Sequence, residues 1–184
     1  MITREQAIVL IKKYIKDKDL IKRSLAVETI LREIARRLHK DEELWGLTGL
    51  LYNIDCEYVG REPENRGTLA SQLLDGLLPE AGVNAIKAIN YMHTNYTPIT
   101  SLDKSLIAAD AVTGLIFNTA RSLSQRNFSE IDIDIILDKL NDTSSASINN
   151  RNRVKLCTDV GMDLDVFLAL SLNIVKKVSN EPGP

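Results

Sequence analysis

The sequence predicts an all-α protein, built as a single domain of about eight or nine helices. Two observations predict this class. Aromatic residues make up only 5% of the 184 residues while Leu, Ile and Ala are abundant, a composition that favours helix over sheet. Apolar residues also recur at intervals of three or four along most of the chain, as in helices with one buried face. We therefore expect one helical domain over residues 1–180 and a frayed tail over 181–184.

The first three helices are predicted by caps and apolar stripes. Thr3 and Gln6 resemble a capping box that opens the first helix. The second helix ends near His39, and Asp41 caps the third helix. The three stripes are, in order, Ile8, Ile11, Tyr14 and Ile15; Ile21, Leu25, Ile30, Ile34 and Leu38; and Leu44, Leu47, Leu51 and Ile54.

The middle of the chain alternates turn-forming residues with helical segments. Residues 56–67 are predicted to be a loop because they include Gly60, Pro63 and Gly67. A fourth helix covers about 68–77. Pro79 fits the first turn of a fifth helix that continues to about His93, and Pro98 then interrupts the helical pattern.

A long apolar helix follows, and we expect it to lie at the centre of the fold. Ser101 is its predicted cap, and the Ala-rich middle of residues 101–123 indicates close packing on several sides. Residues 129–140 alternate apolar and polar positions, as a strand would. Their length and the lack of a partner strand favour a short helix instead.

The last quarter of the chain is predicted to hold a polar loop and two helices. Residues 141–153 are almost entirely polar and are predicted to be a loop. Gly161 ends the helix that follows this loop. Asp163 caps the final helix, which runs from Leu164 to about Val178.

Composition limits the compartment and the partners that we expect. The net charge of −2 gives no general attraction to nucleic acid or to an anionic membrane. No apolar run is long enough to span a membrane, and the charged start of the chain lacks the apolar core of a signal peptide. Cys56 and Cys157 stand outside any CxxC motif and are interpreted as reduced thiols. We expect a soluble cytoplasmic protein.

Four stretches, in their order along the chain, carry a family resemblance. They are SLAVETILREIARRL, DEELWGLTGLLYNIDCEY, AIKAIN and SLDKSLIAADAVTGLI. Together they resemble the HD-domain superfamily of metal-dependent phosphohydrolases, over about Leu20 to Val178. The resemblance implies an HD-type helical bundle. In that family, histidines and aspartates on three helices hold a divalent metal, which activates water for attack on a phosphoryl group.

The sequence departs from this family's metal-binding motif at most positions. The resemblance places Arg23 where the first histidine is expected, and Tyr52 and Asn53 where the His-Asp pair is expected. A further histidine position falls at about Arg66. Asp110 alone stands as the motif requires.

The histidines of the chain do not restore the motif. There are two in all, His39 and His93, and neither falls on a motif position; the remaining family histidine would fall at about Ile89. His39 is interpreted as a surface residue near a helix end, and His93 as a structural residue that faces the former metal pocket. We therefore predict no catalytic residue, no metal ligand and no cofactor.

Three hypotheses concern Asp110, whose carboxylate is costly to bury without a partner. In the first, Arg23 or Arg66 replaces the metal cation and fills the site with an ion pair. In the second, Arg23, Arg66, Tyr52 and Asn53 form an anion pocket that holds a phosphate or a nucleotide.

The third hypothesis is residual catalysis at a carboxylate site. Asp55 and Glu57 would join Asp110 in binding Mg²⁺ or Mn²⁺. Two residues of equal charge at this spacing point in different directions on a continuous helix, so both would reach the pocket only if the helix ends near Ile54.

The functional prediction is a catalytically silent HD-domain protein retained for binding or regulation. One alternative is a phosphate- or nucleotide-binding sensor that uses the pocket of Arg23, Tyr52, Asn53, Arg66 and Asp110. The other is a metal-dependent phosphohydrolase with a carboxylate site. A protein partner or self-association is also expected, and would require an exposed apolar patch.

Overall fold

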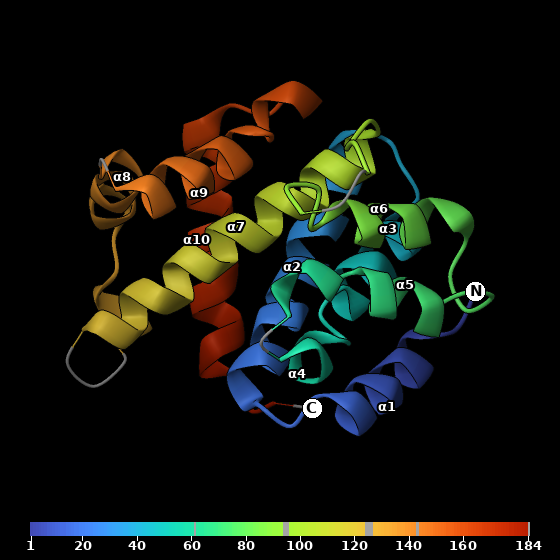
Figure 1. Ribbon diagram of the computed structural model, residues 1–184. Helices are drawn as coiled ribbons and strands as arrows, with labels where there is room; N and C mark the ends of the chain where they lie inside the picture. The colour runs from blue at the N-terminus through green and yellow to red at the C-terminus, as the bar shows by residue number, and fades with distance from the viewer. Residues whose placement is uncertain (61, 94–95, 124–126, 143, 184) are drawn as a thin grey trace.

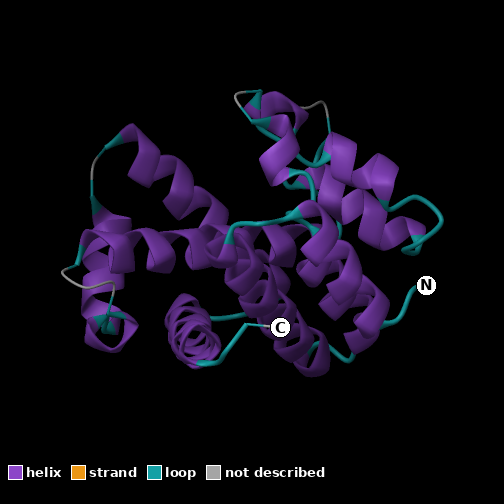
Figure 2. Ribbon diagram, turned by 90° about the horizontal axis from the view of Figure 1, so that it is seen from below, coloured by secondary structure: helices purple, strands orange, loops and turns teal. Residues whose placement is uncertain are grey.

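The computed structural model describes residues 1–60, 62–93, 96–123, 127–142 and 144–183. These residues form helices and loops without a strand, which confirms the all-α class (Figure 2). The α-helices are α1 (Arg4–Tyr14), α2 (Lys18–Arg37), α3 (Glu42–Leu51), α4 (Cys56–Val59), α5 (Thr68–Leu73), α6 (Glu80–Ala88), α7 (Ser101–Ser122), α8 (Ile133–Asn141), α9 (Ser145–Lys155) and α10 (Leu164–Asn180). Short 3-10 turns are η1 (Pro63–Asn65), η3 (Phe128–Glu130) and η4 (Thr158–Val160).

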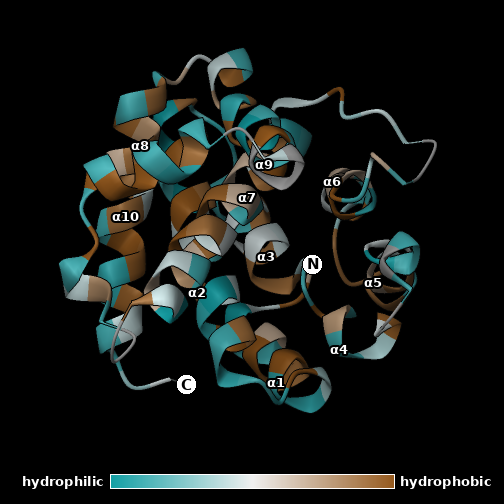
Figure 3. Ribbon diagram, turned by 60° about the vertical axis from the view of Figure 1, so that its left-hand side comes forward, coloured by the Kyte–Doolittle hydropathy of each residue, from teal (hydrophilic) through white to brown (hydrophobic). Residues whose placement is uncertain are grey.

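The long helix α7 runs through the middle of the molecule, as predicted. In Figure 1 it crosses the view diagonally, with α8 and α9 on one side and α2 to α6 on the other, while α10 crosses it in this view. It packs against α2, α6, α9 and α10, and most of its side chains are buried. Hydrophobic and hydrophilic residues alternate along α1 and α10, as expected for helices with one buried face (Figure 3).

Two of the predicted caps are confirmed. The Thr3 hydroxyl accepts a hydrogen bond from the Gln6 amide at 3.3 Å, and the Gln6 side chain accepts one from the Thr3 amide at 2.9 Å. Asp41 accepts a hydrogen bond from the Leu44 amide at 2.9 Å. These contacts satisfy amides that have no partner within the first turn of a helix.

Other predicted helix ends are shifted. Thr100 caps α7 in place of Ser101, because its hydroxyl accepts from the Asp103 amide at 3.1 Å and Asp103 accepts from the Thr100 amide at 3.0 Å. Pro79 lies just before α6, which ends at Ala88 and so stops short of His93. Asp163 stands at the N-cap of α10, but its side chain makes no capping hydrogen bond.

The predicted loop over residues 56–67 is partly helical. It contains α4 and the turn η1. The preceding helix α3 ends at Leu51, and the chain turns through residues 52–55 before α4 begins. The interpretation of residues 129–140 as helical is confirmed by α8.

The predicted loop over residues 141–153 is wrong, because most of it forms α9. The search for apolar periodicity did not predict this helix, because Val154 is the single apolar residue that is buried among its described side chains. Polar contacts hold its position instead. Arg151 donates to the carbonyl oxygens of Leu140 at 2.6 Å and Asp142 at 2.9 Å.

Some predicted loop positions lie outside the described residues, namely 61, 94–95 and 143, as does residue 184 of the predicted tail. Among the helices that the structure describes, none is both long enough and apolar enough to cross a membrane.

Candidate functional site

Asp110 lies on α7 and is only 2% exposed. Its Oδ1 accepts hydrogen bonds from Arg23 Nη2 at 3.2 Å, Arg66 Nη2 at 3.0 Å and the Tyr52 hydroxyl at 3.0 Å. Its Oδ2 accepts from Arg153 Nη2 at 2.6 Å and Arg66 Nη1 at 3.3 Å. One buried carboxylate is therefore surrounded by three guanidinium groups, and we name Arg23, Arg66, Asp110 and Arg153 the arginine cluster.

The arginine cluster confirms the ion pair that the first hypothesis required. Either Arg23 or Arg66 was expected as the partner of Asp110, and both pair with it. Arg153 was missed, because it lies on α9 within the segment predicted to be a loop. Residues 141–153 have little apolar periodicity, so nothing in the sequence indicated that Arg153 would contact a buried carboxylate.

Helical spacing on α2 and α7 brings Arg23 to Asp110. Arg23 lies four residues before Val27 and seven before Ile30, so it shares the buried face of α2. Gly114 follows Asp110 by one turn of α7. A Cβ atom at Gly114 would lie 3.0 Å from Arg23 Nη2, so the missing side chain leaves room for the guanidinium.

The position of Arg66 depends on Asp55. Asp55 Oδ2 accepts hydrogen bonds from the Gly67 amide at 2.7 Å and the Ala70 amide at 2.9 Å, and thereby fixes the start of α5. Gly67 has a φ of +83°, and a Cβ there would approach the Ile86 carbonyl oxygen to 2.5 Å. This residue must be glycine, and its rigid setting places the preceding Arg66.

Tyr52 and Asn53 form a layer behind the arginines. Tyr52 is fully buried, and its ring centroid lies 5.6 Å from Arg66 Cζ, within the range of a cation–π contact. Asn53 Oδ1 accepts hydrogen bonds from Arg66 Nη2 at 2.9 Å and from the Cys56 thiol at 3.0 Å. Both residues therefore orient Arg66.

Asp55 and Glu57 do not join Asp110. Asp55 is committed to the amides at the start of α5, and Glu57 Oε1 accepts from the amides of Lys16 at 2.8 Å and Asp17 at 2.7 Å. Within the described part of the chain, no three His, Cys, Asp or Glu side chains are grouped as a metal site would need. These observations give the carboxylate-site hypothesis no support.

The charges of the cluster shift the pKa values of its members. Burial alone would raise the pKa of Asp110, but the guanidiniums of Arg66, Arg153 and Arg23 outweigh it and hold that pKa far below its ordinary value. Burial, followed by the Asp110 charge, raises the pKa of Tyr52. The phenol therefore stays protonated and donates to a carboxylate that stays ionised.

A cavity of about 470 Å³ opens beside the arginine cluster. The three arginine side chains keep exposures of 21%, 23% and 20%, and ion pairs among the described residues supply one carboxylate for all three. The wall thus carries an excess of two positive charges. It consists of Arg23, Arg66, Met92, His93, Asp110, Ala111, Gly114, Leu115, Asn118, Asn149, Asn150 and Arg153.

The cavity agrees with the sequence-based expectation in part. Arg23, Arg66 and Asp110 line it, and His93 faces it as expected. Tyr52 and Asn53 are not in its wall, contrary to expectation, because they are buried behind Asp110 and Arg66. Their role in the site is to support other side chains.

No protein-family model, curated protein or solved structure matches this chain. The resemblance to HD-domain phosphohydrolases therefore stays a prediction.

Proposed function

We propose that this protein binds the phosphate group of a small molecule in the cavity beside the arginine cluster, and that it does not hydrolyse this ligand. One observation carries the proposal: three arginines face the cavity around a single carboxylate, which leaves an excess of two positive charges. A phosphate monoester brings about −1.5 to −2 charges at neutral pH, which would balance this excess.

The chemistry of the three arginines suits phosphate. A guanidinium offers donors in a fixed fork that matches the oxygens of a phosphate. The Nε atoms of Arg23 and Arg66 are buried without a hydrogen-bond partner among the described residues. Asp110 holds the three cations close together in the absence of ligand, and this preorganisation lowers the cost of binding.

The state of Asp110 favours binding over hydrolysis. Both of its oxygens already accept hydrogen bonds from guanidinium groups, so this carboxylate is not available as a base or as a metal ligand. Membership of the HD-domain superfamily would make the chain a catalytically silent member, with arginines in place of metal ligands. A protein partner or self-association stays a separate prediction.

The test is calorimetric titration with inorganic phosphate at constant ionic strength. We expect saturable binding to the unmodified protein and a loss of affinity of at least about tenfold in Arg153→Gln, since a charged hydrogen bond contributes about 1.5–3 kcal/mol. The matched control is Arg121→Gln, which removes an ion-paired arginine from the central helix α7. Arg121 pairs with Asp19 at 2.9 Å and lies outside the cavity wall.

The outcomes separate the proposal from a purely structural ion-pair cluster. Retained binding in Arg121→Gln and weakened binding in Arg153→Gln would support the proposal. Absence of saturable binding in the unmodified protein would overturn it and leave the arginines as structural partners of Asp110. Release of phosphate from a bound ester would overturn the non-hydrolytic part.

A further inference from the structure

The cavity beside the arginine cluster has room for more than a phosphate group. Its volume of about 470 Å³ lies within the usual range of small-molecule pockets, about 300–1,000 Å³. The wall also extends along α7, where Asp110, Gly114 and Asn118 follow at intervals of four residues. Asn118 therefore lies about 12 Å along the helix axis from Asp110, at 1.5 Å per residue. A ligand that fills this space has a second part.

The part of the wall beyond the arginines is lined by side-chain amides. Asn118 comes from α7, while Asn149 and Asn150 come from α9, which packs alongside α7 (Figure 1). On α9 the two asparagines precede Arg153 by four and three residues, so they share its face. Within the described part of the chain, none of the three amides has a hydrogen-bond partner. Their donors and acceptors are open to a ligand.

These amides are suited to hydroxyl groups. A carboxamide offers two donors and an acceptor, and a hydroxyl group can donate and accept in turn. The described wall holds no Phe, Tyr or Trp ring on which a nucleobase could stack; its one ring is the imidazole of His93, and Tyr52 is 0% exposed behind Asp110. Stacking on aromatic rings is the usual way in which a protein holds a base irrespective of its hydrogen-bonding edge. This wall favours a hydroxyl-rich compound over a nucleotide.

We propose that the ligand is a phosphate monoester of a hydroxyl-rich compound, a sugar or polyol phosphate. Its phosphate contacts the arginine cluster, and its hydroxyls contact the amides of Asn118, Asn149 and Asn150. This inference rests on the proposed function, because it assumes that the arginines hold the phosphate.

The experiment compares four probes by calorimetric titration at one ionic strength: inorganic phosphate, glucose 6-phosphate, ribose 5-phosphate and adenosine 5′-monophosphate. We expect at least one of the two sugar phosphates to bind about tenfold more tightly than inorganic phosphate, the gain from one or two added hydrogen bonds. The nucleotide should bind no more tightly than inorganic phosphate. The same titrations are made on a triple variant, Asn118→Ala with Asn149→Ala and Asn150→Ala.

The triple variant should lose the extra affinity for the sugar phosphate and keep its affinity for inorganic phosphate. Asn173→Ala is the matched control, since Asn173 is an exposed asparagine on α10 outside the cavity wall. Circular dichroism checks that each variant is folded.

Two contrary results are distinguishable. If inorganic phosphate binds and neither sugar phosphate binds more tightly, or if the nucleotide binds best, the inference falls and the proposed function stands. If neither phosphate nor any ester binds, both fall.

Discussion

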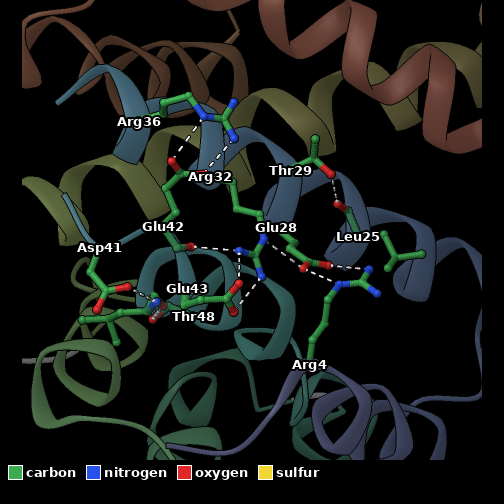
Figure 4. Close-up of polar contacts among 11 residues, drawn as sticks. Arg4, Leu25, Glu28, Thr29, Arg32, Arg36, Asp41, Glu42, Glu43 and Thr48 are labelled. Atoms are coloured by element: carbon green, nitrogen blue, oxygen red, sulfur yellow. Dashed lines mark hydrogen bonds and ion pairs between the residues drawn. The ribbon is translucent and has the colours of Figure 1, made fainter. Parts of the chain in front are cut away.

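Two buried carboxylates, Glu28 on α2 and Asp110 on α7, are each paired with arginines but differ in the balance of charge around them. Glu28 is 3% exposed and pairs with Arg4 at 2.7 Å and Arg32 at 3.2 Å (Figure 4). Arg32 also pairs with Glu43 at 2.9 Å. Arg32 is thus shared between two carboxylates, Glu28 and Glu43. Among the ion pairs of the described residues, the three arginines around Asp110 pair with that carboxylate alone.

The network around Glu28 continues across the surface of α2 and α3. Arg36 pairs with Glu33 at 2.6 Å and with Glu42 at 2.8 Å, and Figure 4 shows its guanidinium directed at Glu42. Arg32 Nη1 also donates to the Glu42 carbonyl oxygen at 3.2 Å, which joins the two groups of ion pairs. The network consists of three arginines and four glutamates: Arg4, Arg32, Arg36, Glu28, Glu33, Glu42 and Glu43. It joins α1, α2 and α3.

The packing around the buried carboxylate is similar at the Glu28 and Asp110 sites. Gly46 leaves space for Arg32, as Gly114 does for Arg23, because a Cβ at Gly46 would collide with the Arg32 guanidinium. Both sites bury a carboxylate under arginines. The difference lies in the balance of charge, and an excess of cations beside a cavity is what distinguishes a candidate binding site from a structural ion-pair network.

The largest expected effect comes from neutralising each buried carboxylate. Asp110→Asn leaves three guanidiniums without a counter-charge and should lower the free energy of unfolding by about 3–5 kcal/mol. Glu28→Gln should also destabilise the protein. Added phosphate should restore part of the loss in Asp110→Asn and little in Glu28→Gln. The recovery is measured as the difference between the free energy of unfolding by urea in phosphate and that in sodium chloride at the same ionic strength. Equal recovery of stability in Asp110→Asn and Glu28→Gln would contradict the distinction between a binding site at Asp110 and a structural network at Glu28.

The second comparison removes one arginine from each site. Arg32 and Arg153 both have side chains 20% exposed, so their burial is matched. Arg32→Ala should lower the free energy of unfolding by about 2 kcal/mol, because Glu28 then keeps only the half-exposed Arg4. Arg153→Ala should cost less than about 1 kcal/mol, since two guanidiniums remain on Asp110 and repulsion among the cations falls. Urea unfolding in buffer without phosphate measures both, and a larger loss in Arg153→Ala would contradict the argument.

The third comparison uses pH. The pKa of Asp110 is lower in the folded protein than its unfolded value of about 3.9, so its contribution to stability is complete above that pH. As the pH falls below about 4, the unfolded state binds a proton first and the contribution is lost. Between pH 4 and pH 2.5 the unmodified protein should lose up to about 1.4 kcal/mol per pH unit more than Asp110→Asn. Parallel pH profiles of the two proteins in urea unfolding would show that Asp110 is not paired as described.

The smallest effect is expected at Glu57, which accepts from two backbone amides at the start of α2. Glu57→Gln keeps an acceptor but loses the charge, and should lower the free energy of unfolding by about 0.5–1 kcal/mol. Phosphate affinity should be unchanged, because Glu57 lies outside the cavity wall. A phosphate affinity of Glu57→Gln that differs from that of the unmodified protein in calorimetry would show that Glu57 contributes to the binding site.

The site could be predicted from the sequence only where a charge argument applied. The family resemblance placed Arg23 and Arg66 at former metal-ligand positions, and the need of a buried Asp110 for a cation indicated their role. Arg153 could not be found in this way, because α9 is held by polar contacts that leave no apolar period. One hypothesis grouped Asp55 and Glu57 with Asp110, but both accept from backbone amides brought close only by the folded chain. In the fold, the capping box at α1 was visible because Thr3 and Gln6 lie within one turn, whereas the similarly spaced box of Thr100 and Asp103 at α7 and the early end of α3 were not predicted.

The polar anchoring of α9 also bears on how ligand binding could be observed. A helix with a single buried apolar residue among its described side chains opens at low free energy compared with a core helix such as α7. Its backbone amides should therefore exchange with deuterium early. A ligand that bridges Arg153 and the asparagines of α9 to Arg23 on α2 and Asn118 on α7 would add its binding free energy to the closed state of this helix. Slower exchange confined to α9 would then report occupancy of the cavity directly, residue by residue, even if the average structure does not move.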